Sequence, residues 1–264
     1  MKQFSDSYFK PLPLLSPGRA LLLRLLMLPN FLLTKVYGLA NLRRTRNASI
    51  YAFNHNNSVE VIMVPVLLIY HLGGRSISFV IDWMYGKVPL LGSLMNMTDP
   101  VYVYNKRSPL SWIEAKRDSG FIDDTVGRCS EKLRAGLNIG IFPEGRRNRD
   151  PHYLLKGKPG IGHIALNTGV PVVPVGIDFD CRARKGKIPM LGRMKVRIGS
   201  PLNFGDQSEA YRAVMTDADG CSLKKMELNR MAGEVTHEVM LCLAELCGKR
   251  YSERDSMKKH SLSN

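Results

Sequence analysis

The chain of 264 residues is long enough to bury a sizeable core, and it predicts one α/β domain with a short appendage rather than two full domains. It holds 38 Lys and Arg against 23 Asp and Glu, and this formal charge of +15 indicates an anionic partner. Phospholipid surfaces, acyl carrier protein, coenzyme A and nucleic acids all qualify. Nucleic acid is disfavoured, because the basic residues lack interleaved aromatic residues and a recognition motif.

The first predicted element is a leucine-rich stretch over residues 12–39. Two prolines and three basic residues interrupt it: Pro17, Arg19, Arg24, Pro29 and Lys35. No run therefore approaches the ~20 apolar residues of a membrane-spanning helix, and no small-residue cleavage site closes the stretch as in a secretory signal. Two interpretations stay open. The stretch is a helical segment that lies in the membrane interface, or it is an amphipathic helix packed on the rest of the protein.

A histidine and a carboxylate, His55 and Glu60, stand between a predicted strand over residues 48–53 and a predicted helix over residues 59–70. Five positions on a continuous helix separate two side chains by roughly 140°, so the pair converges only through the turn between them. A converged pair is acid–base machinery, because the carboxylate holds one ring nitrogen as N–H and leaves the other to accept a proton. The alternative is structural, with Asn57 as the helix N-cap and Glu60 completing a capping box. The two interpretations are compatible.

A second polar cluster follows about ninety residues downstream. Residues 138–142 predict a short buried strand that ends in a Pro143-Glu144-Gly145 turn, and Arg146 and Arg147 come directly after it. Turns after strands are where α/β sheets bind ligands, and a guanidinium group suits a phosphate because it makes two charge-assisted hydrogen bonds. The alternative is a solvated basic loop.

Together these residues resemble the glycerolipid acyltransferase family, which includes the 1-acylglycerol-3-phosphate acyltransferases. Four blocks carry the resemblance, in the family's order and near its usual spacing. They are Asn54-His55 with Glu60, for N-H-x-x-x-x-D; Val88-Pro89-Leu90-Leu91-Gly92 with a run that ends in Lys106-Arg107; Phe142-Pro143-Glu144-Gly145-Arg146-Arg147-Asn148, for F-P-E-G-T-R-S; and Val170-Pro171-Val172-Val173-Pro174-Val175. Glu60 departs from the usual Asp but keeps the charge and the acceptor role. Arg146 departs from the usual Thr and adds a cation, which bears on the acceptor substrate.

The resemblance implies an α/β fold with a mixed sheet flanked by helices, as in glycerol-3-phosphate acyltransferases. Residues 1–44 would be an N-terminal segment at the membrane interface, residues 45–250 the acyltransferase domain and residues 251–264 a disordered tail. The implied reaction moves a fatty acyl group from a thioester, on acyl carrier protein or coenzyme A, to a lysophospholipid hydroxyl. 1-Acylglycerol 3-phosphate is the preferred acceptor and phosphatidate the product. A different lysolipid, an amino-acid-linked acceptor, or a non-catalytic membrane lipid-binding protein are the alternatives.

The resemblance also implies roles for single residues. His55 would take the proton from the acceptor hydroxyl, and Glu60 would stabilise the resulting imidazolium. The implied substrate-binding residues are Glu144, Gly145, Arg146, Arg147, Lys106, Arg107 and Lys158. Lys106 and Arg107 both qualify, since the match to the second block needs about one extra residue. Lys158 precedes a Gly-rich helix start, which can hold an anion, although the same residues can form a plain turn.

The remaining pattern alternates between strands and helices. Further strands are predicted over residues 76–81, 100–104, 171–177 and 194–198, and further helices over residues 110–134, 161–167 and 222–247. This alternation predicts a sheet with helices on its faces. The basic segment over residues 182–197 is either an edge that faces a membrane or an acyl carrier, or a solvated loop.

The remaining predictions concern location and bound groups. The five cysteines form no C-x-x-C pair and indicate reduced thiols, and the expected location is the cytoplasmic face of a membrane. The histidines outside the first block have no ligand-like spacing, so no metal is expected, and no cofactor is expected either. The tail from Ser252 is polar and predicts disorder. The oligomeric state stays open.

Overall fold

The computed structural model describes residues 10–44, 47–89, 91–104, 106–117, 124–179, 192–216 and 222–251. Within these ranges one seven-stranded sheet has the strand order β1-β7-β6-β2-β5-β3-β4. The strands are β1 (Thr34–Tyr37), β2 (Ile50–Phe53), β3 (Ile77–Asp82), β4 (Val101–Val103), β5 (Asn138–Ile141), β6 (Val172–Phe179) and β7 (Met194–Ile198). Neighbouring strands pair in parallel except β6 and β7, which are antiparallel. The predicted mixed sheet is therefore confirmed.

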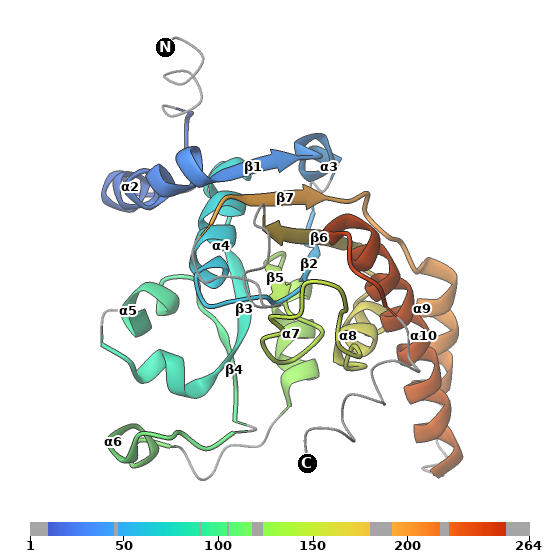
Figure 1. Cartoon of the computed structure of the whole chain (residues 1–264). Coiled ribbons are helices and arrows are strands. Elements are labelled where there is room, and N and C mark those ends of the chain that lie inside the picture. The colour runs from blue at the N-terminus through green and yellow to red at the C-terminus, as the bar shows by residue number, and fades with distance from the viewer. Residues whose placement is uncertain are drawn as a thin grey trace.

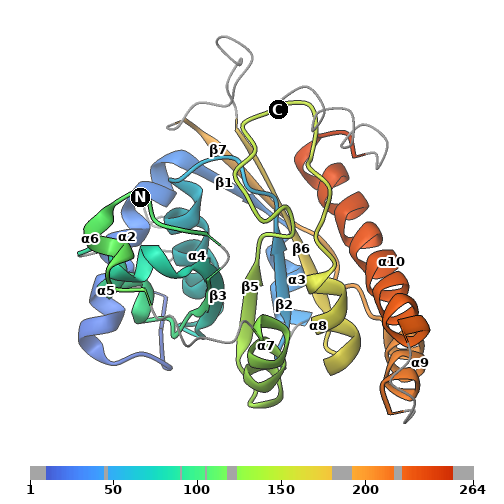
Figure 2. The same ribbon diagram turned by 90° about the horizontal axis from the view of Figure 1, so that it is seen from below.

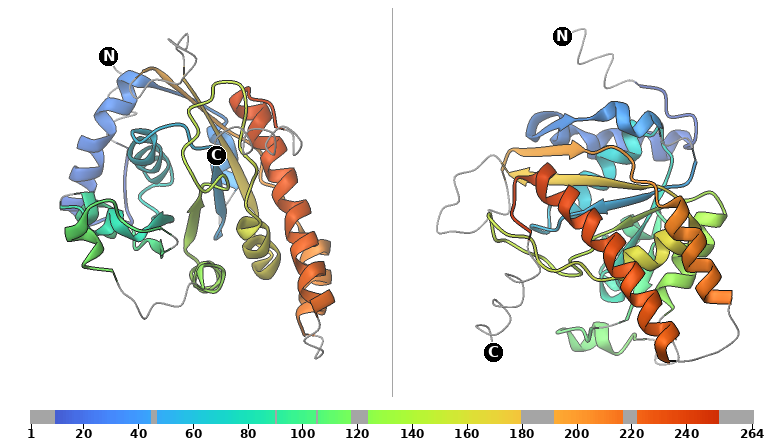
Figure 3. Two further views of the ribbon diagram at one scale, coloured as in Figure 1. Left: turned by 60° about the horizontal axis from the view of Figure 1, so that its bottom comes forward. Right: turned by 90° about the vertical axis from the view of Figure 1, so that its right-hand side faces the viewer.

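Helices cover both faces of the sheet (Figures 1 and 2). One side carries α2 (Pro17–Leu33), α4 (Glu60–His71), α5 (Leu91–Asn96) and α6 (Ser111–Glu114), and the other carries α7 (Thr125–Arg134), α8 (Gly160–Thr168), α9 (Gly205–Thr216) and α10 (Ser222–Cys247). The short elements α3 (Leu39–Arg44) and η1 (Trp83–Lys87) complete the described chain. In Figure 3, α10 crosses the sheet diagonally, and its C-terminal end lies beside the end of β6.

The core has two halves because the strand residues alternate between the two faces. On β2, Tyr51 and Phe53 belong to the apolar cluster under α2 and α4. Ile50 and Ala52 belong to the cluster under α7, α8 and α10. All four residues are fully buried, as is usual for a parallel strand with helices on both sides. The sheet therefore holds the C-terminal ends of β2 and β5 in a rigid centre.

Two sequence predictions differ from the structure. The helix predicted over residues 110–134 is broken, because residues 115–117 form a turn and a new helix starts after Asp124. Asp124 has a non-helical backbone, and its carboxylate accepts a hydrogen bond from the Gly127 N–H at 2.8 Å, so it is the N-cap of α7. The leucine-rich stretch also does not stay helical, because Thr34–Tyr37 pairs in parallel with β7 as an edge strand. The sheet thus continues across the domain boundary expected at residue 44.

Other predictions meet the limits of the described chain. The predicted strand over residues 194–198 and the predicted helix over residues 222–247 coincide with β7 and α10, whereas α9 was not predicted. Residues 182–191 of the basic segment and the tail from Ser252 lie outside the described residues.

Helix α2 packs on the rest of the protein with one face and exposes leucines on the other. Its inner face buries Ala20, Leu23, Met27 and Asn30, and the Asn30 amide donates to the Met63 carbonyl oxygen of α4 at 3.0 Å. Its outer face exposes four leucines at helical spacing: Leu21, Leu25, Leu28 and Leu32. Across the described ranges, no helix has both the length and the apolarity needed to cross a membrane.

The described cysteines carry free thiols. Cys129 and Cys247 are buried, and burial raises the pKa of each thiol to about 12. Cys242 is partly exposed. Cys181 and Cys221 lie outside the described residues.

Candidate active site

Two central strands deliver the polar residues of the site. β2 and β5 pair in parallel, so the residues that follow them emerge at the same edge of the sheet. His55 comes two residues after β2, and residues 142–148 follow β5. The two sequence blocks that stand about ninety residues apart therefore meet in one place (Figure 2).

The structure brings His55 and Glu60 into direct contact. The His55 Nδ1 atom lies 2.9 Å from the Glu60 Oε1 atom. The Glu60 side chain is fully buried, whereas 15% of the His55 side chain is exposed. Because an ionised carboxylate can only accept a hydrogen bond, Nδ1 carries the proton and Nε2 keeps its lone pair. The geometry suits a base whose free nitrogen is Nε2.

Glu60 also closes the first turn of its helix. The Asn57 Oδ1 atom accepts hydrogen bonds from the N–H groups of Val59 at 2.9 Å and of Glu60 at 3.2 Å. In return, the Asn57 N–H donates to Glu60 Oε1 at 3.1 Å. This reciprocal pattern is a capping box. The capping interaction and the contact with His55 thus coexist on one carboxylate.

Two buried asparagines tie the loop before α4 to β6. The Asn54 side chain continues the pairing of β2 with β6, since it donates to the Ile177 carbonyl oxygen at 2.9 Å and accepts from the Ile177 N–H at 2.6 Å. The Asn56 amide donates to the same oxygen at 3.1 Å and to Glu60 Oε2 at 3.1 Å. The Asn56 N–H also donates to Glu60 Oε1. The carboxylate is therefore held from several directions.

Glu144 supports the loop from the other side and does not line the cleft. Its Oε1 atom accepts from the His55 N–H at 2.9 Å, and its Oε2 atom accepts from the Leu155 N–H at 2.9 Å and from the Asn148 amide at 3.1 Å. Burial raises the pKa of Glu144, and these hydrogen bonds together with the charge of Lys249 partly offset the rise. The side chain thus fixes the backbone that carries His55.

A cleft of about 820 Å³ opens beside His55. The predicted site residues that line it are His55, Lys106, Arg107, Gly145, Arg146, Arg147 and Lys158. Glu60 and Glu144 stand behind this surface, both buried. The cleft joins a histidine base to a strongly basic wall, and this wall suits an anionic ligand.

Arg147 lies close to the histidine loop. Its Nη1 atom donates to the Ser58 Oγ atom at 2.6 Å, and Ser58 itself lines the cleft three residues after His55. A guanidinium group is thereby held next to the base. Sequence reasoning did not single out Ser58, because a serine in a polar loop has no distinctive pattern.

The Pro-Gly turn after β5 makes room for Lys158. Gly145 has a φ angle of +65°, and a Cβ atom there would lie 2.6 Å from the Lys158 Cε atom. A side chain at this position would therefore be strained and would displace the lysine. Elsewhere in the cleft lining, the Lys106 Nζ atom pairs with the Asp82 Oδ2 atom at 3.1 Å.

The ring of Phe142 packs against His55, with 4.6 Å between the ring centroids. Phe142 also lies 5.3 Å from the ring of Phe53. The imidazole is thus held between an aromatic ring and a carboxylate, which restricts its orientation. Sequence reasoning placed Phe142 at the end of a strand and in the third block, and it missed this contact.

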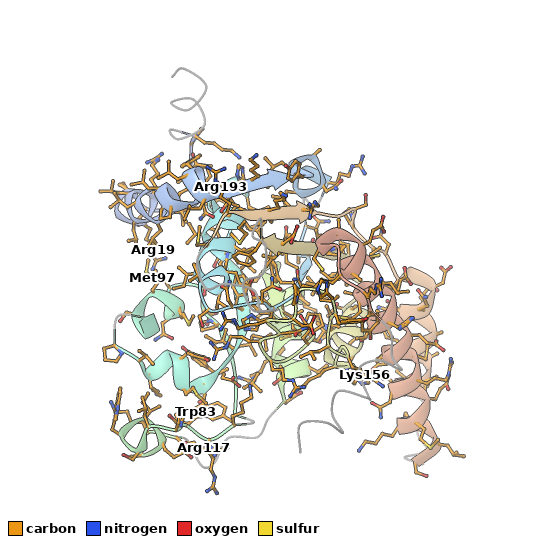
Figure 4. The ribbon with its side chains drawn as sticks, viewed as in Figure 1. Arg19, Trp83, Met97, Arg117, Lys156 and Arg193 are labelled. Atoms are coloured by element: carbon orange, nitrogen blue, oxygen red, sulfur yellow. The ribbon has the colours of Figure 1, made fainter. Side chains whose placement is uncertain are left out.

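A second, apolar groove adjoins the cleft and has a volume of about 330 Å³. The two share four residues: Val61, Ile62, Ile81 and Met95. The groove runs between α2, α4 and α5, and Figure 4 labels Arg19 and Met97, which both line it. In the part of the chain that the structure describes, no group of three or more His, Cys, Asp or Glu residues is placed to hold a metal ion.

Fold and site define an α/β protein with a histidine–carboxylate pair beside a basic cleft, and comparison with known proteins gives the class. The sequence profile of the family described as Acyltransferase matches residues 34–178. This match covers more than half of the chain. The protein belongs to the acyltransferase family.

Individual relatives are more distant. The chain is 30% identical over 176 residues to the chloroplastic 1-acyl-sn-glycerol-3-phosphate acyltransferase BAT2 of Brassica napus. This aligned region covers 67% of this chain and 43% of the relative. It is 29% identical over 140 residues to the chloroplastic 1-acyl-sn-glycerol-3-phosphate acyltransferase LPAT1 of Arabidopsis thaliana. That aligned region covers 53% of this chain and 34% of the relative. The chain thus spans less than half the length of these two curated relatives.

The fold has a counterpart among solved structures. The crystal structure of the 1-acyl-sn-glycerophosphate (LPA) acyltransferase PlsC from Thermotoga maritima superposes with a TM-score of 0.50 and 18% sequence identity. The superposition covers 96% of this chain and 91% of that chain. At this identity the likeness concerns the fold alone.

Proposed function

We propose that this protein transfers a fatty acyl group from a thioester donor to the free hydroxyl of 1-acylglycerol 3-phosphate, which gives phosphatidate. The carrying observation is the contact of 2.9 Å between His55 Nδ1 and Glu60 Oε1 beside a cleft with a basic wall. Family membership supports an O-acyltransferase. The names of the two curated relatives support a lysophosphatidic acid acceptor. The donor is an acyl thioester of acyl carrier protein or of coenzyme A.

The reaction needs a base but no covalent enzyme intermediate, because a thioester is already activated. His55 Nε2 takes the proton of the acceptor hydroxyl while its oxygen attacks the thioester carbonyl carbon. The tetrahedral intermediate then breaks its carbon–sulfur bond, and the imidazolium returns the proton to the leaving thiolate. Glu60 stabilises the imidazolium between these two steps, as a carboxylate does in a catalytic triad.

The basic wall binds the acceptor's phosphate. Arg147 offers a planar fork for two hydrogen bonds to phosphate oxygens, and its contact with Ser58 holds it near His55. Lys158 lies across Gly145, with Arg146 on the same turn. Positioning the phosphate in this way brings the neighbouring glycerol hydroxyl to the base, and such orientation is a large part of catalysis.

The apolar groove takes a fatty acyl chain. It is continuous with the cleft through Val61, Ile62, Ile81 and Met95, and most of its lining residues are apolar. Burial of apolar surface favours the bound chain by roughly 0.8 kcal/mol for each methylene group. The reacting carbonyl then lies at the mouth of the groove, beside His55.

The outer leucines of α2 support an association with a membrane. Leu21, Leu25, Leu28 and Leu32 are each between 42% and 79% exposed. Leucines on one face with nearby Arg19 and Arg24 fit an interfacial helix that contacts phospholipid head groups. We infer that membrane phospholipid is a partner and that the protein acts at the cytoplasmic face.

One observation supports a different acceptor as a second candidate. Arg146 stands where the family's third block has threonine, so the cleft has an additional guanidinium group. A lysolipid with a different anionic head group, or an amino-acid-linked acceptor, would use this cation. The activity assay below therefore includes several acceptors.

The function is tested by incubating the full chain in detergent with acyl carrier protein and coenzyme A thioesters against a panel of lysolipids, with product masses as the readout. We expect phosphatidate from 1-acylglycerol 3-phosphate. His55→Ala removes the base and lowers the rate by about 10²–10⁴-fold. His152→Ala is the matched control, because His152 is exposed and does not line the cleft. Wild-type turnover in His55→Ala excludes this mechanism. If the wild type turns over no combination of donor and acceptor, the alternative is a lipid-binding protein without catalysis.

The Glu60→Gln variant separates the two functions of that side chain. Glutamine keeps an acceptor oxygen for the capping box but cannot stabilise an imidazolium. We expect most activity to be lost while the urea midpoint changes little. If Glu60→Gln keeps its activity, the carboxylate is only a helix cap.

A further inference from the structure

The end of α10 turns a lysine into the interior. Gly248 has a φ angle of +69°, its N–H donates to the Glu245 carbonyl oxygen at 3.3 Å, and the Lys249 N–H donates to the Ala244 carbonyl oxygen at 3.0 Å. This is a Schellman motif with glycine at the C′ position. The next residue, Arg250, is held by backbone hydrogen bonds to the chain around residue 153. Lys249 is consequently only 7% exposed.

The buried ammonium group reaches the loop that carries the histidine. Lys249 Nζ donates to Asn56 Oδ1 at 2.6 Å. An ammonium group can only donate, so it determines which end of the Asn56 amide faces it. The amide nitrogen must then point the other way, where it donates to Glu60 Oε2 at 3.1 Å. Lys249 shares this role with the Asn54 amide, which donates to the same Asn56 oxygen at 3.3 Å, and with the Ile177 carbonyl oxygen, which accepts from the Asn56 amide at 3.1 Å. Asn56 in turn holds Glu60.

The charge of Lys249 also acts on a buried carboxylate. Glu60 and Glu144 both contact His55, and they are 0% and 3% exposed. Burial raises the pKa of Glu144, because it disfavours the charged form, and the charge of Lys249 partly offsets this rise.

Other charged and titratable groups face this region from the elements packed on it. Asp178 on β6 pairs with Arg197 on β7 at 3.6 Å. The Cys247 thiol on α10 is buried, and its pKa is raised by burial and, to a smaller extent, by Glu144 and Asp178. Neither group hydrogen-bonds Asn56 or Glu60 within the described residues, so Lys249 is the cation in direct contact with the Asn56–Glu60 pair.

We propose that Lys249 is a positioning residue of the active site, which orients Asn56 so that Glu60 stays aligned on His55. The inference rests on the proposed acyl transfer. Lys249 lies 193 residues from Asn56 and beyond residues 34–178, the part of the chain that the family profile matches. The C-terminal helix is therefore required for the catalytic pair as well as for the core.

The test compares Lys249→Met with Arg250→Met. Methionine keeps the length of the side chain but removes the charge and the donors, and Arg250 is an exposed neighbour with the same charge. In Lys249→Met we expect kcat to fall by about ten- to hundredfold, the size of effect seen when residues that orient metal ligands are removed. The KM for the acceptor stays unchanged. The acidic limb of the kcat/KM profile moves to higher pH, because Glu144, which holds the His55 backbone, is protonated more easily without the cation. Arg250→Met retains wild-type values.

A double variant tests the route through Asn56. If Lys249 acts through that amide, Lys249→Met and Asn56→Leu together cost little more than the larger single effect. Additive losses, or an unchanged pH profile in Lys249→Met, mean that Lys249 is only structural, and they overturn the inference. Wild-type kinetics in Lys249→Met overturn it as well. Lys249→Gln, which keeps a donor, serves if the methionine variant does not fold.

A spectroscopic readout separates this inference from the proposed reaction. The ¹⁵N shifts of the His55 ring report which nitrogen carries the proton, without any turnover. We expect one tautomer, with the proton on Nδ1, in the wild type and a mixture in Lys249→Met. An unchanged single tautomer overturns the role of Lys249 even if no substrate is turned over. If Lys249→Met shows a mixture of tautomers but the wild type transfers no acyl group, the proposed function is overturned while the role of Lys249 is supported.

Discussion

Single residues in this site serve structure and chemistry together. Glu60 caps α4 through Asn57 and contacts His55 through the same oxygen atom. Glu144 is buried behind the cleft and holds the His55 backbone. Because Glu60 and Glu144 hold the ring and the backbone of His55, the histidine is oriented before substrate arrives, which lowers the cost of reaching the reactive geometry.

The first prediction at this scale concerns Arg147. If its guanidinium binds the phosphate, Arg147→Ala lowers kcat/KM for 1-acylglycerol 3-phosphate by about 10–100-fold, the cost of hydrogen bonds to a charged group. The KM for the thioester donor stays unchanged. Arg147→Lys recovers part of the loss, because lysine keeps the charge but loses the two-pronged contact. The measurement is steady-state kinetics with each substrate varied.

Two further variants complete that experiment. Arg134→Ala removes an exposed arginine outside the cleft and serves as the control. Arg146→Thr restores the residue that the family usually has. If it weakens another acceptor and spares 1-acylglycerol 3-phosphate, Arg146 determines specificity for that second substrate. If neither arginine substitution changes the kinetics with any acceptor, the phosphate is bound elsewhere. Lys106, Arg107 and Lys158 are then the next residues to replace.

At the scale of elements, α2 has two faces with different partners. Its inner face packs on α4, and Asn30 bonds across to the Met63 carbonyl oxygen. Its outer face is a row of exposed leucines. The helix is therefore part of the fold and at the same time exposes an apolar surface. The chain continues directly into β1, so the surface that we propose to contact a membrane adjoins the edge strand of the sheet.

The second prediction addresses this outer face. The double substitution Leu25→Glu and Leu28→Glu weakens binding to anionic phospholipid vesicles by at least tenfold, because each leucine contributes roughly 1.5–3 kcal/mol when buried. Vesicle sedimentation measures the bound fraction. Leu241→Glu on α10 is the control, since this leucine is exposed on the other side of the sheet. Equal losses in both proteins would mean that charge, not the α2 surface, controls binding.

At the scale of the whole molecule, a partly buried histidine makes the stability depend on pH. His71 ends α4, and Lys10 donates to its carbonyl oxygen at 2.8 Å. Burial, with a smaller contribution from the charge of Lys10, lowers the pKa of His71 to about 4, against 6.5 when it is exposed. Between these values the unfolded chain binds the proton and the folded chain does not. The contribution of His71 to the free energy of unfolding is therefore fully present above pH 6.5 and is lost as the pH falls toward 4.

The third prediction follows from this sign. His71 alone removes about 2 kcal/mol from the free energy of unfolding between pH 7 and pH 4.5. The difference between wild type and His71→Gln, measured by urea unfolding at both pH values, isolates this contribution from other groups. His152→Gln, at an exposed position, keeps the wild-type slope. Parallel pH dependences in wild type and His71→Gln would show that His71 is protonated in the folded protein.

Much of the fold was predictable because local patterns carry it. The strand predicted over residues 194–198 and the helix predicted over residues 222–247 coincide with β7 and α10. The broken helix after residue 114 was not predicted, since the N-cap at Asp124 competes with an otherwise helical pattern. β1 was also missed, because four residues form a strand there only by pairing with β7 about 160 residues later.

The sequence by itself determined the chemistry of the site: a histidine, a carboxylate five residues later, and a basic turn after a buried strand. These features depend on residue type and on spacing within a few turns of chain, where hydrogen bonds and side-chain periodicity act locally. Only the tertiary structure decided that Glu60 caps and contacts His55 at once, that Arg147 meets Ser58, and that Lys249 reaches Asn56. Such contacts join segments 89 and 193 residues apart, and their geometry depends on how the whole core packs.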